Sequence, residues 1–239
     1  MNVRSPTRGA TPGDAARPRL YAVTHAVRDP GPLRAALAEI VAAADVAAVL
    51  LDLADADERG LVNAVKALAP AVQAAGTALV VAGRPGIVAR GGADGAHLSG
   101  GAALREALST LKPAFIAGAG GLMSRHDAMR AAEAGADYVM FGEPGGDGRC
   151  PAFDAVADRV AWWAEVFEVP CVAFAPGLDD IAALAAAGAD FVAVGGDALF
   201  GDPRGPGAAA TEAAARLAAA RRKPATTATT PPAATETAP

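Results

Sequence analysis

The sequence of 239 residues has few aromatic residues, few cysteines and no long apolar run. Aromatic residues make up 5% of the chain and apolar residues as a whole 52%, so a core must consist mostly of Ala, Val and Leu. Two cysteines, Cys150 and Cys171, are too few for a disulfide framework, and the three histidines lack metal-ligand spacing. No run approaches the roughly 20 apolar residues of a membrane span. We therefore expect no membrane insertion and a reducing, cytoplasmic compartment.

A large excess of charge of one sign is also missing. The chain has 21 basic and 26 acidic residues, a net charge of −5, which gives no general attraction to nucleic acids or anionic lipids. We expect no nucleic-acid partner and no binding to membranes. The composition instead leads us to expect a soluble protein.

Both ends of the chain are poor in large apolar side chains, so burial would not offset the entropy lost on ordering them. Residues 1–19 are predicted to be a disordered N-terminal tail. The Ala-, Thr- and Pro-rich residues 223–239 are predicted to be a disordered C-terminal tail. Residues 20–222 between them are predicted to form a single domain.

Short β-branched segments alternate with longer Ala-rich segments of helical period, which indicates βα units around a parallel sheet. Strands are expected at residues 20–24, 46–53, 78–82, 95–98, 114–117, 138–141, 171–174 and 191–194. Helices are expected at residues 32–44, 57–75, 85–90, 101–110, 124–134, 154–167, 178–187 and 207–222.

A Gly-Ala-Asp repeat begins at Gly92, Gly135 and Gly188, each time between a predicted helix and a predicted strand. Glycine there can take the left-handed conformation that ends a helix, and the aspartate can accept hydrogen bonds from backbone donors. Repeated αβ units with eight strands favour a single-domain (β/α)8 TIM barrel over an open doubly wound sheet. Such a barrel carries its chemistry at the carboxyl ends of the strands.

Three segments carry a resemblance to a known family. Leu20-Tyr-Ala-Val-Thr24 is similar to its first strand, residues 48–56 align without gaps with its second-strand motif, and residues 80–98 match its segment ending in Gly-Ala-Asp-Gly-Val-His-Leu. On these motifs the chain resembles the thiamine-phosphate synthase and TenI-type family. The resemblance implies a barrel that joins hydroxymethylpyrimidine diphosphate to thiazole phosphate and releases diphosphate. It also implies Mg²⁺ and phosphorylated small molecules as ligands.

Several aligned positions depart from the family pattern. Asp52 and Ala54 stand where the family has Arg and Lys, and Ala82 and Gly83 replace its Asn-Asp pair. Gly86 replaces an aspartate that ligates the metal. One donor to developing charge is commonly worth about 10²- to 10³-fold in rate. Two functions therefore stay open: a thiamine-phosphate synthase-like enzyme, and a non-catalytic or repurposed barrel that binds a phosphorylated small molecule or a regulatory partner.

Candidate phosphate-binding residues follow the predicted strands. Backbone N–H groups of glycines can hold an anion, or the glycines can serve only tight turns, and both interpretations stay open. Counting back from Gly135 puts Gly121 at the family's phosphate-binding Ser, and Met123 at the His of TenI-type proteins. Arg84 is retained from the family pattern, and Arg149 could replace its Lys. The candidate set is Arg84, Gly118, Gly120, Gly121, Arg149, Gly195 and Gly196.

His97 and Asp52 form a candidate polar pocket. His97 ends a predicted strand and is either a packed, hydrogen-bonded side chain or a catalytic one. Asp52 needs a partner if buried, and we expect it to pair with Arg84. No residue is assigned as catalytic or as a metal ligand. Trp162 and Trp163 are adjacent on a predicted helix and cannot both face the core, which raises the hypothesis of a homo-oligomer.

Overall fold

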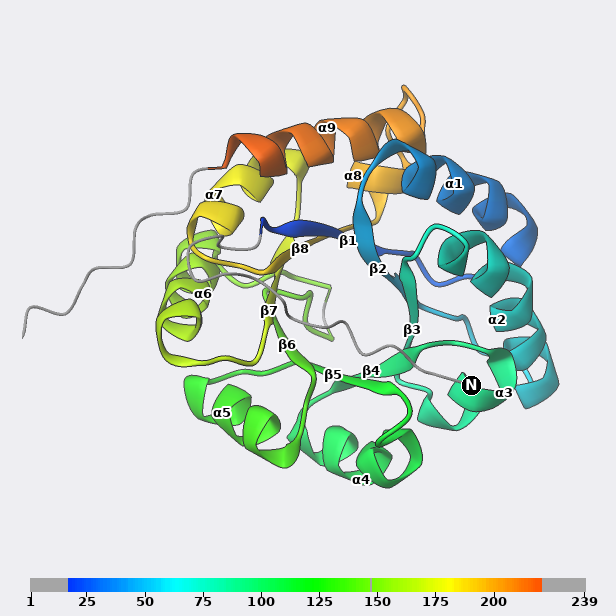
Figure 1. The fold of residues 1–239 in the computed structure, drawn as a ribbon, viewed down its shortest axis with the longest axis horizontal. Coiled ribbons are helices and arrows are strands. Elements are labelled where there is room, and N and C mark those ends of the chain that lie inside the picture. The colour runs from blue at the N-terminus through cyan, green and yellow to red at the C-terminus, as the bar shows by residue number, and fades with distance from the viewer. Residues whose placement is uncertain (1–16, 147, 221–239) are drawn as a thin grey trace, which may run out of the picture.

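The computed structural model describes residues 17–146 and 148–220, which form a closed barrel of parallel strands ringed by helices (Figure 1). The strands follow one another around the barrel in chain order, and β1 pairs with β8 to close it. They are β1 (Arg19–Val23), β2 (Val46–Leu51), β3 (Ala78–Ala82), β4 (Gly95–Ser99), β5 (Ile116–Gly120), β6 (Tyr138–Phe141), β7 (Cys171–Ala175) and β8 (Phe191–Gly195). The predicted (β/α)8 barrel is confirmed.

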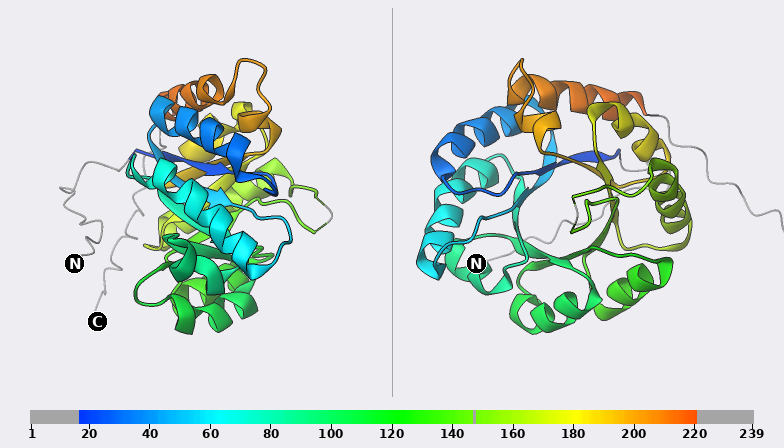
Figure 2. Two further views of the ribbon diagram at one scale, coloured as in Figure 1. Left: turned by 90° about the vertical axis from the view of Figure 1, so that its right-hand side faces the viewer. Right: turned by 180° about the vertical axis from the view of Figure 1, so that it is seen from behind.

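The helices lie outside the strands, as the two views in Figure 2 show. They are α1 (Pro30–Ala43), α2 (Glu58–Gln73), α3 (Val88–Gly91), α4 (Gly101–Leu111), α5 (Arg125–Ala134), α6 (Phe153–Val166), α7 (Ile181–Ala186), α8 (Asp197–Phe200) and α9 (Pro206–Ala219). Short 3₁₀ turns, η1 (Pro85–Ile87) and η2 (Leu178–Asp180), precede α3 and α7. In the described ranges no helix is long and apolar enough to cross a membrane.

The largest error in the predicted elements concerns β5, which was expected at residues 114–117 and lies at Ile116–Gly120. Its two glycines, Gly118 in the middle and Gly120 at the end, have low strand propensity and so hid the strand. The helix α8 was not predicted at all, because four residues give no helical period. The tails predicted at residues 1–19 and 223–239 lie outside the described residues, apart from residues 17–19, of which Arg19 begins β1.

Apolar side chains form two cores because successive strand residues point to opposite faces. The larger core lies between the strands and the helices and contains Trp163, the largest fully buried side chain. The smaller core fills the barrel and includes Tyr21, Leu50, Tyr138 and Met140. Trp162, the neighbour of Trp163, is half-buried, packs on Phe167 and lies under the Arg125 guanidinium at 4.7 Å. Homo-oligomerisation through this region stays a prediction.

The Gly-Ala-Asp repeats lie at the amino-terminal rim of the barrel. Gly92, Gly135 and Gly188 have φ values of 78°, 107° and 112°, the left-handed conformation expected at helix ends. The Asp94 carboxylate accepts a hydrogen bond from the Leu79 N–H at 2.7 Å, and the Asp94 N–H donates to the Leu79 carbonyl at 2.8 Å. The same reciprocal pair joins Asp137 to Ala117 and Asp190 to Cys171.

A fourth aspartate, Asp45, precedes β2 and accepts from the Arg19 guanidinium at 2.6 and 2.9 Å. An aspartate therefore stands before every even-numbered strand and bonds to the strand before it. The repeated contact holds neighbouring strands in register around the rim. The carboxyl ends of the strands are therefore aligned at the opposite end of the barrel, which we call the mouth.

Candidate functional site

The candidate site residues all come from the half of the barrel where the strands end. His97 is in β4, Gly118 and Gly120 are in β5, and Gly195 ends β8. The remaining candidates follow a strand: Asp52 after β2, Arg84 after β3, Gly121 after β5, Arg149 after β6 and Gly196 after β8. These positions surround the carboxyl-terminal mouth, where barrel enzymes carry their chemistry.

A glycine turn leads from β8 into α8. Gly195 lies against Val23 of β1, and a Cβ there would come within 2.9 Å of the Val23 Cβ. Gly196 has φ +55° and is the N-cap residue of α8. The first N–H groups of a helix have no partner within it and carry partial positive charge, so they can receive a phosphate. A short extra helix after the last strand often supplies this phosphate site in TIM barrels.

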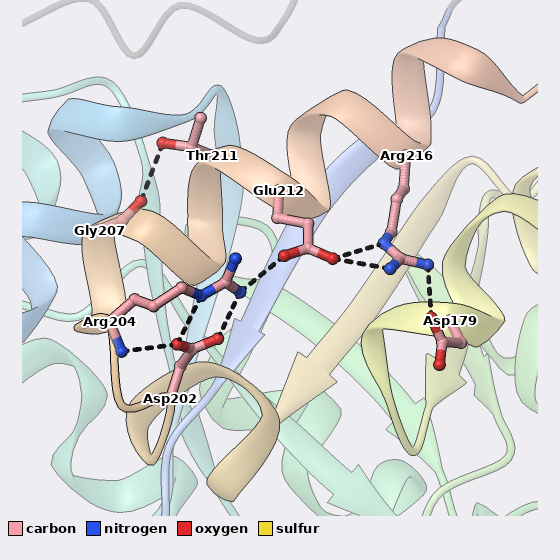
Figure 3. Close-up of polar contacts among 7 residues, drawn as sticks. All are labelled: Asp179, Asp202, Arg204, Gly207, Thr211, Glu212 and Arg216. Carbon is pink, nitrogen blue, oxygen red and sulfur yellow. Dashed lines mark hydrogen bonds and ion pairs between the residues drawn. The ribbon is translucent and has the colours of Figure 1, made fainter.

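Ion pairs hold the chain on either side of α8 (Figure 3). Arg204, between α8 and α9, donates to Asp202 at 2.7 Å and to Glu212 of α9 at 2.6 Å. Arg216 of α9 contacts Glu212 at 2.7 Å and Asp179 of η2 at 2.7 Å. Hydrogen bonds from Arg204 lower the pKa of Asp202 to about 2. The connections after β7 and β8 are thus both anchored to α9.

Four side chains form a hydrogen-bonded chain from the barrel interior to the mouth. The Tyr21 and Tyr138 hydroxyls are 2.8 Å apart, and the Tyr138 hydroxyl is 2.9 Å from His97 Nδ1. His97 Nε2 is 2.8 Å from Glu143 Oε1, while the Gly121 N–H donates to Glu143 Oε2 at 2.9 Å. The side chains of His97 and Glu143 are 5% and 20% exposed, so the pair is largely desolvated.

The hydrogen-bond pattern assigns the protons in this chain. Burial acts to raise the pKa of Glu143, but its interactions with His97 and the Gly121 N–H outweigh burial and lower it. The ionised carboxylate can only accept, so His97 Nε2 carries a proton. The next hydrogen bond joins His97 Nδ1 to the Tyr138 hydroxyl, and the last joins the Tyr138 and Tyr21 hydroxyls.

Two of the candidate glycines leave space for these hydrogen-bonded side chains. A Cβ on Gly118 would lie 2.1 Å from Tyr138 Cζ. A Cβ on Gly120 would lie 1.9 Å from Glu143 Oε2 and 2.3 Å from His97 Nε2. Both glycines are inside β5, so the tight-turn interpretation is wrong for them. Gly121 does turn, with φ +61°. Phosphate binding by the three stays a prediction.

The expected pair between Asp52 and Arg84 is wrong. Arg84 instead donates to Asp55 Oδ1 at 2.7 Å and to the Leu53 carbonyl at 3.3 Å. After β2 the chain continues beside residues 24–27, with Leu53 bridged to Val27, and this carries Asp55 to Arg84. The Asp52 side chain is exposed at the mouth.

Arg149 is exposed in the connection between β6 and α6, where its carbonyl accepts from the Gly145 N–H at 2.9 Å. Sequence reasoning missed Glu143 in the same connection, and it missed the roles of Tyr21 and Tyr138. The two tyrosines could have been found, because they are the only ones in the chain and strand alternation points both inward. Nothing in the sequence singles out Glu143.

The described residues do not fit a built Mg²⁺ site. Within 17–146 and 148–220, no three His, Cys, Asp or Glu side chains gather as metal ligands. Mg²⁺ takes oxygen ligands in octahedral geometry and needs at least one or two carboxylates beside substrate phosphates. Asp55 is engaged by Arg84 and Glu143 by His97, so no chemical step is assigned to a metal.

Comparisons with known proteins point to one family. A family model described as thiamine monophosphate synthase matches residues 20–197. A curated thiamine-phosphate synthase from Rhodospirillum centenum is 40% identical over 198 residues, which cover 81% of this chain and 95% of the relative. Another from Hyphomonas neptunium is 34% identical over 204 residues, covering 81% and 90%. A thiamine phosphate pyrophosphorylase structure from Pyrococcus furiosus, 22% identical, shares the fold with a TM-score of 0.72 over 85% of this chain and 97% of its own.

Proposed function

Because this chain belongs to the thiamine monophosphate synthase family, we propose that its barrel mouth joins hydroxymethylpyrimidine diphosphate to thiazole phosphate. The reaction forms thiamine phosphate and releases diphosphate. The observation that carries the proposal is the 40% identity to a curated synthase across 95% of that relative's length. The glycine turn into α8 supports it, since a phosphorylated substrate needs an anion site at the mouth.

In this proposal the N–H groups at the start of α8 hold the phosphate of the thiazole, and Gly196 lets the backbone approach it without a side chain. Arg84, half-buried after β3, faces the departing diphosphate. Charge builds on the diphosphate oxygens as the carbon–oxygen bond breaks, so a fixed cation accelerates that step. Family members use Mg²⁺ for the same purpose, but the described residues build no cage for it.

A second candidate function is ligand binding without turnover. Arg84 already shares its charge with Asp55, and Asp52 and Ala54 stand where two family cations would lie. The mouth therefore keeps the glycine turn proposed to bind the thiazole phosphate. It lacks two of the cations that would bind the diphosphate in other family members. A barrel of this kind would bind thiamine phosphate without forming it, or act as a regulatory partner.

The test uses the purified chain with both family substrates, with and without Mg²⁺, and measures thiamine phosphate and released diphosphate. The proposed enzyme gives turnover that rises at least about tenfold in the double variant Asp52→Arg/Ala54→Lys, which restores two cations. Absence of turnover in both proteins, with thermal stabilisation by thiamine phosphate, establishes the binding function instead. Absence of both turnover and stabilisation contradicts both functions.

A further inference from the structure

Two N–H donors at the mouth converge on one carboxylate of the protein itself. The Gly121 N–H at the end of β5 points to Glu143 Oε2, and His97 Nε2 in β4 points to Oε1. Converging backbone and imidazole donors are the usual construction of a site for a phosphate or carboxylate. Here two neighbouring βα units, those of β4 and β5, supply the donors, and Glu143 from the next unit occupies the site.

The backbone is shaped around this internal anion. Gly120 leaves the space that Glu143 Oε2 and His97 Nε2 occupy, because a Cβ there would overlap both. The hydrogen bonds through Tyr138 and Tyr21 fix the His97 ring from the opposite side. Glu143 thus sits in a fitted position with both oxygens bonded, and its exposed edge faces the mouth.

We propose that Glu143 is a specificity-determining residue that occupies the anion position beside β5, binds the N–H groups or positive charge of a ligand ring, and so directs the diphosphate of the substrate away from β5. This inference rests on the proposed function, because it takes hydroxymethylpyrimidine diphosphate as the substrate. The Glu143 carboxylate disfavours diphosphate near β5 in two ways. Its negative charge repels diphosphate, and it already occupies the N–H donors that diphosphate would need.

The ligand chemistry follows from the free lone pairs of Glu143. Each carboxylate oxygen accepts one hydrogen bond within the protein and can accept another. The matching group is an aminopyrimidine, which presents N–H donors, or a thiazolium, which is cationic. Hydroxymethylpyrimidine diphosphate carries the aminopyrimidine and thiamine phosphate carries both rings, so both fit Glu143 when their phosphates lie away from β5.

The test measures binding by calorimetry, with thiamine phosphate and inorganic diphosphate as separate probes and no Mg²⁺. Glu143→Ala frees both donors, so we expect it to bind diphosphate at least about tenfold more tightly than the unmodified protein and thiamine phosphate about tenfold more weakly. Asp154→Asn is the matched control, because it removes one negative charge from the exposed first turn of α6, in the same βα unit as Glu143, without freeing an N–H group. Its diphosphate affinity should change less than about threefold.

Unchanged diphosphate affinity in Glu143→Ala, or an equal gain in Asp154→Asn, overturns the proposal. If circular dichroism shows that Glu143→Ala is unfolded, the diphosphate affinity of Glu143→Gln is measured instead, since glutamine keeps the side-chain shape. A gain in diphosphate binding of at least about threefold then supports the proposal, and no gain overturns it. The diphosphate measurement does not require turnover, so failure of the coupling assay is distinguishable from failure of this inference.

Discussion

The amino-terminal rim of the barrel repeats one hydrogen-bonded unit, whereas the carboxyl-terminal mouth uses different side chains in each connection. At the rim, Asp94, Asp137 and Asp190 each form the same reciprocal pair with the preceding strand. At the mouth, the connection after β8 contributes the glycine turn at Gly196, and the connection after β6 contributes the carboxylate of Glu143. The repeated end holds the strands, and the varied end is free to recognise a ligand.

This division predicts that substitutions at the rim change stability and leave ligand affinity alone. Substitutions at the mouth should change ligand affinity and cost less stability. Each of the following variants tests one side of the comparison.

The largest loss of stability is expected for Asp94→Ala at the amino-terminal rim. The change leaves the N–H of the fully buried Leu79 without its carboxylate acceptor, at a cost of about 2 kcal/mol in the free energy of unfolding. In a barrel of this size that lowers the melting temperature by roughly 4–8 °C. Urea denaturation measures the first quantity, and calorimetric titration should find the affinity for thiamine phosphate unchanged.

Two variants serve as controls for this prediction. Asp94→Asn keeps a carbonyl oxygen in place and should lose about half as much stability. Asp158→Ala, at an exposed position of α6, should change the free energy of unfolding by less than about 0.5 kcal/mol. A loss of ligand affinity in Asp94→Ala that matches its loss of stability would contradict the separation of the two ends.

The same division explains which features the sequence could predict. The rim was predictable because its unit recurs three times, with glycine, alanine and aspartate in fixed order beside periodic apolar segments. The mouth was only partly predictable. The sequence placed Gly196 and Arg84 after strands, where the structure has them, but the partner of Arg84 depends on the path of the chain after β2.

Glu143 could not be predicted because its contacts come from β4 and β5, more than twenty residues away in the chain. An acidic residue in a glycine-rich connection has no periodicity and no local motif. Likewise the purpose of Gly118 and Gly120 became visible only with the side chains that fill the space beside them. Contacts between side chains that are far apart in the chain leave no local pattern in a single sequence.

A smaller loss of stability is expected for Gly120→Ala at the mouth, where the new Cβ meets the flexible end of Glu143 and the ring of His97. Moving those ends should cost about 1 kcal/mol in the free energy of unfolding, the low end of the range for overpacking. Because Glu143 must move off the Gly121 N–H, diphosphate affinity should rise as it does in Glu143→Ala. Urea denaturation and calorimetric titration measure the two effects, and a stability loss above about 3 kcal/mol would show that the pair is structural.

Arg84→Ala should change stability less. Its ion pair with Asp55 involves a fully exposed carboxylate, and exposed pairs contribute about 0–1 kcal/mol. If Arg84 contacts a phosphorylated ligand, the affinity for hydroxymethylpyrimidine diphosphate should fall about tenfold, which titration can measure. The control is Arg90→Ala, which removes an exposed arginine paired with Glu58 and should leave that affinity unchanged. Equal affinities in both variants would remove Arg84 from the site.

The smallest effect is a dependence of stability on pH at the ion pairs around α9. The pKa of Asp202 is about 2 in the folded protein, below the roughly 3.9 of an unfolded chain. A lowered pKa in the folded state means that the stabilisation is present above pH 4 and is lost as the pH falls towards 2. Asp202→Asn should therefore be less stable than the unmodified protein at pH 7, and the difference should shrink between pH 4 and pH 2. Urea denaturation at several pH values measures it, and a difference that stays constant over this range would mean that Asp202 stabilises the connection through its shape rather than its charge.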